Sequence, residues 1–196
     1  MWWDTELMPF IELSDEDQQK LLSLARESIQ VRRLFERDLQ VDETIFSPAL
    51  KQQAASFVTL RKKSKLRGCI GALEATQPLV VGTVQHAAAS AFEDPRFPAI
   101  SREEVAELHI EISVLTEPMP LSFSSEANLL AQLVSGKDGL VIEKGRHRAT
   151  FLPTVWDSIP DKTQFLEQLK LKAGLPLNFW SDKLKAWRYH TVCFQE

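Results

Sequence analysis

Cysteine, unbalanced positive charge and long apolar runs are scarce or missing in this sequence of 196 residues. The only two cysteines, Cys69 and Cys193, lie far apart and lack paired spacing, so we expect free thiols in a reducing compartment and no structural zinc site. The formal net charge of -4 removes the basic footprint that most duplex-binding proteins carry. No apolar run reaches the roughly 18 residues that a membrane span needs, and the opening MWWDTELMPF lacks the features of a signal peptide. We therefore expect a cytoplasmic protein without nucleic-acid, membrane or metal partners.

The composition is that of an ordinary globular protein, with 44% hydrophobic and 26% charged residues. Residues 14–37 open with a serine cap and acidic residues, and their apolar spacing predicts an amphipathic helix. Two strand-like runs flank the basic tip 61–65, which predicts a hairpin, and an alanine-rich helix follows from Pro78. Residues 107–115 (ELHIEISVL) alternate apolar and polar side chains, as a half-buried strand does.

The last third of the chain continues this mixture. It predicts a short helix that Gly136 ends, a second hairpin about Lys144–Arg146, a helix that Gly174 ends, and a closing strand over 188–196. Helices and strands intermix without a regular strand-helix-strand repeat. We therefore predict an α+β fold with mixed sheet and helices.

The stretch KLRGCIGAL, residues 65–73, places two glycines around Cys69 inside a predicted strand. Arg67, Cys69 and Gly71 share one strand face, so the guanidinium favours a thiolate and Gly71 leaves a space beside the sulfur. Gly68 and Gly71 together let a ligand, or a second segment of backbone, come close. A purely structural role for Cys69 stays open, because free cysteine is among the most buried residue types.

A nucleophilic cysteine needs a base within hydrogen-bonding reach, and two residues near the motif are candidates. His86 lies in the middle of the predicted helix after the motif, on a polar stripe with Ser90 and Glu93. Glu74 closes the motif strand and is an alternative acid or base. Either residue has a plain alternative as a solvent-facing or packing side chain.

Three further residues are candidates for binding. Asp94 and Arg96 belong to the turn DPRFP, and Glu111 lies on the polar side of the strand 107–115. Arg67 and Arg96 would form a bidentate anion site if both faced the same cleft. The alternative is structural: Asp94 caps the turn at Pro95 and pairs with Arg96.

Five motifs occur in a fixed order and together resemble the AMMECR1 family, also called AmmeMemoRadiSam system protein A. They are LRGCIG, DPRFP at 94–98, EISVL at 111–115, GLVIEKG with ATFLPTVW, and FLEQLKLKAGLP followed by a tryptophan. The resemblance covers about residues 50–196, and the helix at 14–37 fits more loosely.

The resemblance implies one AMMECR1-like domain over residues 1–196, made of two closely packed subdomains with a cleft between them. It places RGCIG near that cleft, with DPRFP close by. It also implies partnership with Memo-like and radical SAM proteins in a shared pathway, but it supplies no reaction and no cofactor. It leaves the oligomeric state open.

Two classes of function remain from the sequence. In the first, the chain is an enzyme or enzyme subunit that uses a Cys69 thiolate on an anionic small-molecule or protein-borne substrate. In the second, it is a non-catalytic module that binds a protein or peptide, and Cys69 only packs the floor of a groove. The reactivity of the thiol separates them, because a packing cysteine reacts only on unfolding.

Overall fold

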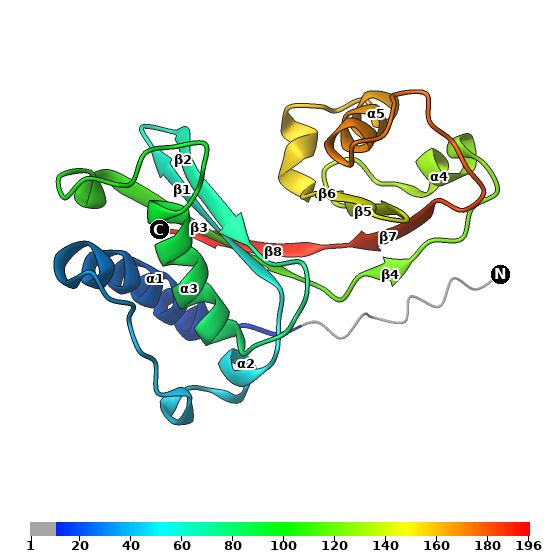
Figure 1. Ribbon diagram of the computed structural model, residues 1–196. Coiled ribbons are helices and arrows are strands. Elements are labelled where there is room, and N and C mark those ends of the chain that lie inside the picture. The colour runs from blue at the N-terminus through cyan, green and yellow to red at the C-terminus, as the bar shows by residue number, and fades with distance from the viewer. Residues whose placement is uncertain (1–10) are drawn as a thin grey trace. The chain divides into compact units, whose positions relative to one another are not determined.

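A computed structural model describes residues 11–196, which fold into two compact units (Figure 1). Unit 1 comprises the described residues up to Thr116 and the segment Val192–Glu196, and unit 2 is Glu117–Thr191. Each unit has its own four-stranded sheet and its own apolar core. The fold is α+β, as the sequence predicts, and the opening MWWDTELMPF lies outside the described residues.

The sheet of unit 1 has the strand order β2-β1-β3-β8. Its strands are β1 (Ser56–Lys62), β2 (Lys65–Gly71), β3 (Leu108–Leu115) and β8 (Thr191–Gln195). β1 pairs antiparallel with both β2 and β3. The predicted hairpin is confirmed: Lys63 and Ser64 form its turn with positive φ angles of 49° and 64°, which a tight two-residue turn requires. β2 is therefore an edge strand.

Two helices cover one face of this sheet, α1 (Asp15–Phe35) and α3 (Leu79–Phe92) (Figure 1). The predicted N-terminal helix is confirmed: the Ser14 side chain caps α1, and three acidic residues follow in the first turn, where the helix dipole favours them. α3 packs on β1 and β2, while α1 packs on β3. Three short helical segments complete the unit: η1 (Glu43–Ile45), α2 (Pro48–Lys51) and η2 (Glu104–Glu107).

The alternation predicted for β3 separates the two faces of the sheet. Ile110 and Ile112 are fully buried on the helix side, whereas His109 and Glu111 are partly exposed. The face opposite the helices therefore carries the partly exposed polar side chains of β3. Cys69 joins this face, because its backbone pairs with Thr59, which in turn pairs with Glu111.

Unit 2 has the strand order β4-β7-β5-β6. Its elements are β4 (Met119–Pro120), α4 (Glu126–Gln132), β5 (Gly139–Lys144), β6 (His147–Phe151), η3 (Pro153–Asp157), α5 (Lys162–Lys172) and β7 (Lys185–Tyr189). The rings of Trp156 and Phe165 stack in its core with centroids 3.6 Å apart. The predicted second hairpin and the helix ending before Gly174, which has a φ of +76°, are confirmed.

The single closing strand predicted over 188–196 is wrong. The chain leaves the extended ladder at His190, so β7 belongs to the sheet of unit 2 and β8 to that of unit 1. Tyr189 is fully buried in unit 2, where its hydroxyl bonds Thr150 Oγ1 and the carbonyl of Phe151. Phe194 packs into the core of unit 1. The two ends of one strand-like sequence are thus held by different cores.

None of the helices within residues 11–196 is both long and apolar enough to cross a membrane.

Candidate functional site around Cys69

The DPRFP turn covers the edge of β2 at Cys69. The Cys69 N–H donates to Asp94 Oδ2 at 2.9 Å, and the Cys69 carbonyl accepts from Arg96 Nη2 at 3.2 Å. Both outward backbone groups of Cys69 are therefore satisfied by side chains, as a neighbouring strand would satisfy them. We call this pair of contacts the Asp94–Arg96 clamp. It fixes the backbone of Cys69 and blocks strand addition at that point of the edge.

Asp94 and Arg96 hold each other in this clamp. Asp94 Oδ1 accepts from the Arg96 backbone N–H at 3.1 Å and from Nε at 2.9 Å, and Oδ2 accepts from Nη2 at 2.7 Å. Hydrogen bonds from Arg96 first, and from the Cys69 backbone next, hold the pKa of the Asp94 carboxyl well below its usual value. The Asp94 side chain is 3% exposed. The turn-capping alternative predicted for Asp94 is confirmed, with the Cys69 backbone as an additional partner.

Cys69 is partly exposed as a residue, and its sulfur has one hydroxyl neighbour. Thr59 Oγ1, from the paired position on β1, donates to Cys69 Sγ at 3.3 Å. Glu111 occupies the next position across the sheet, and its Oε2 lies 3.5 Å from Arg61 Nε. The row of side chains on this face is therefore thiol, hydroxyl and carboxylate, with the carboxylate separated from the sulfur by Thr59.

Arg67 lies on the same strand face as Cys69 but binds Glu104 in η2. Its Nε and Nη2 donate to the two carboxylate oxygens at 3.1 and 3.0 Å. Hydrogen bonds from Arg67, from the Ser101 backbone and from Lys62 lower the pKa of the Glu104 carboxyl to about 2. The Arg67 charge is therefore balanced by a carboxylate. The predicted use of Arg67 as a free cation beside the sulfur needs correction for this reason.

The predicted bidentate anion site needs the same correction. Arg67 and Arg96 do come close to a common group, because their guanidinium carbons lie 5.9 and 5.5 Å from the ring centroid of Phe97. Each guanidinium, however, already forms a two-point contact with a carboxylate, Glu104 or Asp94. The cluster of two arginines and two acids around Phe97 has no excess positive charge of its own.

The two glycines of the motif allow close packing, and they leave no open space. A Cβ on Gly68 would lie 2.1 Å from the carbonyl oxygen of Ser90 in α3. A Cβ on Gly71 would lie 2.3 Å from the carbonyl oxygen of Ser56, so the predicted space beside the sulfur at Gly71 is filled. Of the alternatives drawn from the sequence, the approach of a second backbone segment is confirmed, most clearly at Gly68.

Ser90 uses this close approach to enter the sheet. Its hydroxyl accepts from the Ile70 N–H at 2.8 Å and donates to the Val58 carbonyl at 2.8 Å. Ile70 and Val58 face each other across β2 and β1, so the Ser90 hydroxyl bridges the two strands. The motif LRGCIG is thereby joined to α3 on one side and to the DPRFP turn at its edge.

The chain is similar to known proteins in both its sequence and its fold. The sequence model of the AMMECR1 family matches residues 22–194. The chain belongs to the AMMECR1 family. A protein from Methanothermobacter thermautotrophicus is 34% identical over 195 residues, covering 96% of this chain and 99% of its own. Protein SSO0193 of Saccharolobus solfataricus is 36% identical, covering 97% and 86%. The crystal structure of the uncharacterised protein PH0010 from Pyrococcus horikoshii has a TM-score of 0.88 at 33% identity, covering 95% of this chain and 94% of its own.

Two predicted catalytic residues of this AMMECR1-family chain are not brought to the sulfur. His86 Nδ1 lies 3.2 Å from Ser56 Oγ, and Ser56 is buried on the helix side of β1, opposite to Thr59 and Cys69. Burial lowers the pKa of the His86 imidazole, which disfavours its charged form. Glu74 is exposed in the bend after β2. Within the described residues no group of three or more His, Cys, Asp or Glu is placed to hold a metal ion.

Sequence reasoning missed Thr59 and Glu104 in the AMMECR1-family site, and it placed Ser90 only on the polar stripe with His86. The outward position of Thr59 could have been predicted, because Thr59 lies between Val58 and Leu60 in the strand and so points away from the core. Glu104 carries a local signal, because Ser101 and Glu104 form the serine-to-glutamate capping pair, with backbone contacts of 3.1 and 3.3 Å. That signal predicts the turn of η2, but it does not predict the contact with Arg67.

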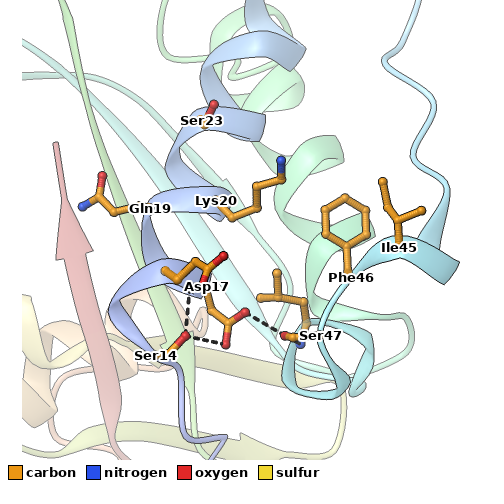
Figure 2. Close-up of a pocket in the computed structure, with 10 residues that line it drawn as sticks. Ser14, Asp17, Gln19, Lys20, Ser23, Ile45, Phe46 and Ser47 are labelled. Atoms are coloured by element: carbon orange, nitrogen blue, oxygen red, sulfur yellow. Dashed lines mark hydrogen bonds between the residues drawn. The ribbon is translucent and has the colours of Figure 1, made fainter.

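A separate hollow of about 620 Å³ lies in unit 1, between the first half of α1 and the segment 45–50. Figure 2 shows Asp17 joining its two walls, where it accepts from Ser14 Oγ at 3.0 Å and from Ser47 Oγ at 2.7 Å. Ile45 and Phe46 form an apolar side of the hollow (Figure 2). None of the residues around Cys69 lines it, so it is not part of the Cys69 site.

Proposed function

We propose that this AMMECR1-family protein is an enzyme or enzyme subunit whose reactive group is the thiolate of Cys69. One observation carries this function: Cys69 is a partly exposed residue whose sulfur accepts a hydroxyl hydrogen bond, while its backbone is fixed by the Asp94–Arg96 clamp. A donor aimed at the sulfur favours its charged form over the thiol. A fixed backbone holds the nucleophile in one position, which lowers the entropic cost of attack.

The clamp supports this function more than it supports simple packing. A cysteine that only fills space needs no exposure and no hydroxyl at its sulfur. Here two charged side chains and the Thr59 hydroxyl hold a small residue that still contacts solvent. Charged groups are expensive to commit to a buried contact, and Asp94 is almost wholly buried while it bonds Cys69.

The reaction class that fits is addition of sulfur to an electrophilic carbon. The S–H bond breaks, the S–C bond forms, and the π electrons of a carbonyl or activated alkene move to the acceptor atom, which takes up a proton. This balance needs no further reactant. The base that removes the thiol proton is then water or the substrate, since His86 and Glu74 lie elsewhere.

We expect the substrate to be a small molecule or a protein-borne group. The anionic character predicted from Arg67 and Arg96 has less support, because each guanidinium is bound to a carboxylate. A shared pathway with Memo-like and radical SAM proteins stays a prediction from the family resemblance. The alternative, a non-catalytic protein- or peptide-binding module, is the reading that an unreactive Cys69 would favour.

The test is the rate of iodoacetamide alkylation at Cys69 in the Cys193→Ser variant, with the unfolded chain as reference. We expect the folded protein to be labelled at least as fast as the unfolded chain. Thr59→Val should slow this labelling, because it removes the donor to the sulfur while keeping the shape. Labelling only on unfolding would reject the catalytic function and favour the binding module.

A second pair of reagents separates charge recognition from reactivity. Iodoacetate and iodoacetamide react with the same sulfur but differ by one negative charge. Arg67 and Arg96 are each bound to a carboxylate, so they should not favour the anionic reagent. The ratio of the two reagents' rates in the folded protein should therefore stay within about threefold of the ratio in the unfolded chain, an energy difference below about 0.7 kcal/mol. A tenfold preference for iodoacetate would restore the anionic substrate class.

A further inference from the structure

Of the eleven arginines of the described chain, seven are bound to a carboxylate, and four (Arg33, Arg37, Arg102 and Arg146) form no ion pair with a described residue. Ion pairs are formed by Arg26, Arg32, Arg61, Arg67, Arg96, Arg148 and Arg188. Arg33 and Arg102 form none with any residue from 11 to 196, and both are exposed. Arg33 and Arg102 differ from Arg37 and Arg146 in that they lie together at one place on unit 1.

These two arginines line the same hollow. It has a volume of about 250 Å³ and is lined by Gln30, Arg33, Leu34, Arg102, Val105 and Ala106. The first three come from the second half of α1, and the others from the segment that contains η2. Leu34 is 52% exposed, while Val105 is 8% exposed and belongs to the core of unit 1. The hollow thus combines an apolar floor with two cations and an amide.

Glu103 lies within electrostatic reach of both arginines, but it forms no ion pair with either of them. Its carboxylate accepts a hydrogen bond from Ser101 Oγ at 2.8 Å. Hydrogen bonds from its own backbone and from Ser101 lower the pKa of the Glu103 carboxyl, with smaller contributions from Arg33 and Arg102. It forms no ion pair with any described residue. Both guanidinium groups therefore keep donors available for an external acid.

We propose that this hollow binds an acidic segment of a partner protein, with one apolar side chain seated on Leu34 and Val105 and flanking carboxylates bound by Arg33 and Arg102. Arginine forks match carboxylates in geometry, and acidic motifs are commonly read by arginine clusters around an apolar anchor.

The size of the hollow favours a protein segment over a metabolite. Sites that enclose a small molecule commonly reach about 300–1,000 Å³ and bury most of the ligand. A hollow of about 250 Å³ is smaller than that, and it holds one side chain whose backbone stays outside. Nucleic acid fits less well, because the acidic chain would repel a long polyanion beyond the two contacts. None of the lining residues contributes to the Cys69 site, so this surface is independent of the proposed reaction.

The experiment is a nitrogen-15 chemical-shift titration of the full chain with two blocked heptapeptides, EDLFEDL and its neutral counterpart QNLFQNL, at low salt. We expect saturable shifts from the acidic peptide at the backbone amides of 30–34 and 102–106, and at least tenfold weaker binding of the neutral peptide. Arg33→Gln combined with Arg102→Gln should weaken the acidic peptide at least tenfold. Arg146→Gln, which removes an exposed arginine from the β5–β6 turn in unit 2, is the matched control and should leave binding unchanged.

Three outcomes would overturn this interaction surface. The first is the absence of shifts at these amides with the acidic peptide at millimolar concentration. The second is an equal loss of binding in the Arg146→Gln control, which would mean attraction by overall charge alone. The third is an equal response to inorganic phosphate at matched ionic strength, which would make the hollow a site for small anions. Cys69 alkylation should be unchanged in the double variant, so failure here leaves the proposed reaction untouched.

Discussion

Replacing Gly68 by alanine should loosen unit 1 strongly, because the motif strand and α3 share one contact of backbone with backbone. The added Cβ would lie 2.1 Å from the Ser90 carbonyl oxygen and 3.0 Å from its carbonyl carbon. Neither atom can rotate away, so the end of α3 must move off the sheet. That movement also pulls the Ser90 hydroxyl from its bridge between Ile70 and Val58.

The size of the effect follows from those two losses. Overpacking a core costs about 1–3 kcal/mol, and each of the two hydrogen bonds of Ser90 contributes about 1 kcal/mol. We therefore expect a loss of about 3–5 kcal/mol in the free energy of opening of unit 1, which a domain with about 5–15 kcal/mol of stability survives. Since about 1.4 kcal/mol corresponds to a factor of ten, protected amides of β1 and β2 should exchange roughly a hundredfold to a few thousandfold faster.

Hydrogen exchange read by mass spectrometry is the suitable assay, because peptides from 56–71 report on unit 1 and peptides from 139–151 report on unit 2. The matched control is Gly82→Ala in the interior of α3, where the nearest atom to a new Cβ is the flexible amide of Gln77 at 3.3 Å. Helix propensity favours alanine there by about 1 kcal/mol, so exchange should slow or stay unchanged. Exchange of the β2 peptide in Gly68→Ala within tenfold of the wild type would refute the packing account.

Three further measurements address charged groups. At pH 7, Glu104→Gln should lower the free energy of unfolding by up to about 3 kcal/mol. This loss should fade as pH falls from 4.5 toward 2, because the pKa of the Glu104 carboxyl is depressed in the folded protein. A loss independent of pH would contradict this account. Lys170 Nζ is fully buried, 2.7 Å from Glu126. Glu126→Ala should therefore destabilise by about 3 kcal/mol because it leaves a buried charge without its partner, while Lys170→Met removes that charge and should be near neutral. Equal losses in urea titrations would contradict this. Below pH 6.5 the wild type should lose thermal stability relative to His86→Gln, because burial lowers the pKa of His86 in the folded protein and the unfolded chain takes up the proton first. Melting temperatures of the two proteins that change in parallel with pH would contradict this.

Local pattern was enough to predict most elements of the fold. The alternation of β3, the serine cap of α1 and the turn of the first hairpin depend on neighbours in sequence. The last two are confirmed, and the alternation is confirmed over 108–112, whereas Ser113 and Leu115 are buried as well. The break at His190 could not be predicted, because 188–196 has no glycine or proline and reads as one extended segment. What divides it is the competition between two cores, which no local pattern records.

The site was predictable in its location and less so in its connections. The clustering of glycines at 68 and 71 marked a close approach, but Gly71 was read as an opening, whereas the backbone of Ser56 fills that space. The polar stripe of His86 and Ser90 is compatible with either a site or packing in the sequence, and in the structure Ser90 is 1% exposed and bridges two strands. Partners such as Glu104 lie 37 residues from Arg67, so only the tertiary fold brings them together.

The insertion of unit 2 between β3 and β8 has a consequence for the order in which the protein acquires its structure. β8 is synthesised after all of unit 2, so a growing chain holds a complete unit 2 while the sheet of unit 1 still lacks its edge strand. The final closure is long-range, since Arg26 in α1 bonds Glu196 across 170 positions. Contacts of such separation form slowly. Until then β3 presents an unpaired edge, and a nascent chain stalled at this stage would be the form of this protein most in need of a chaperone.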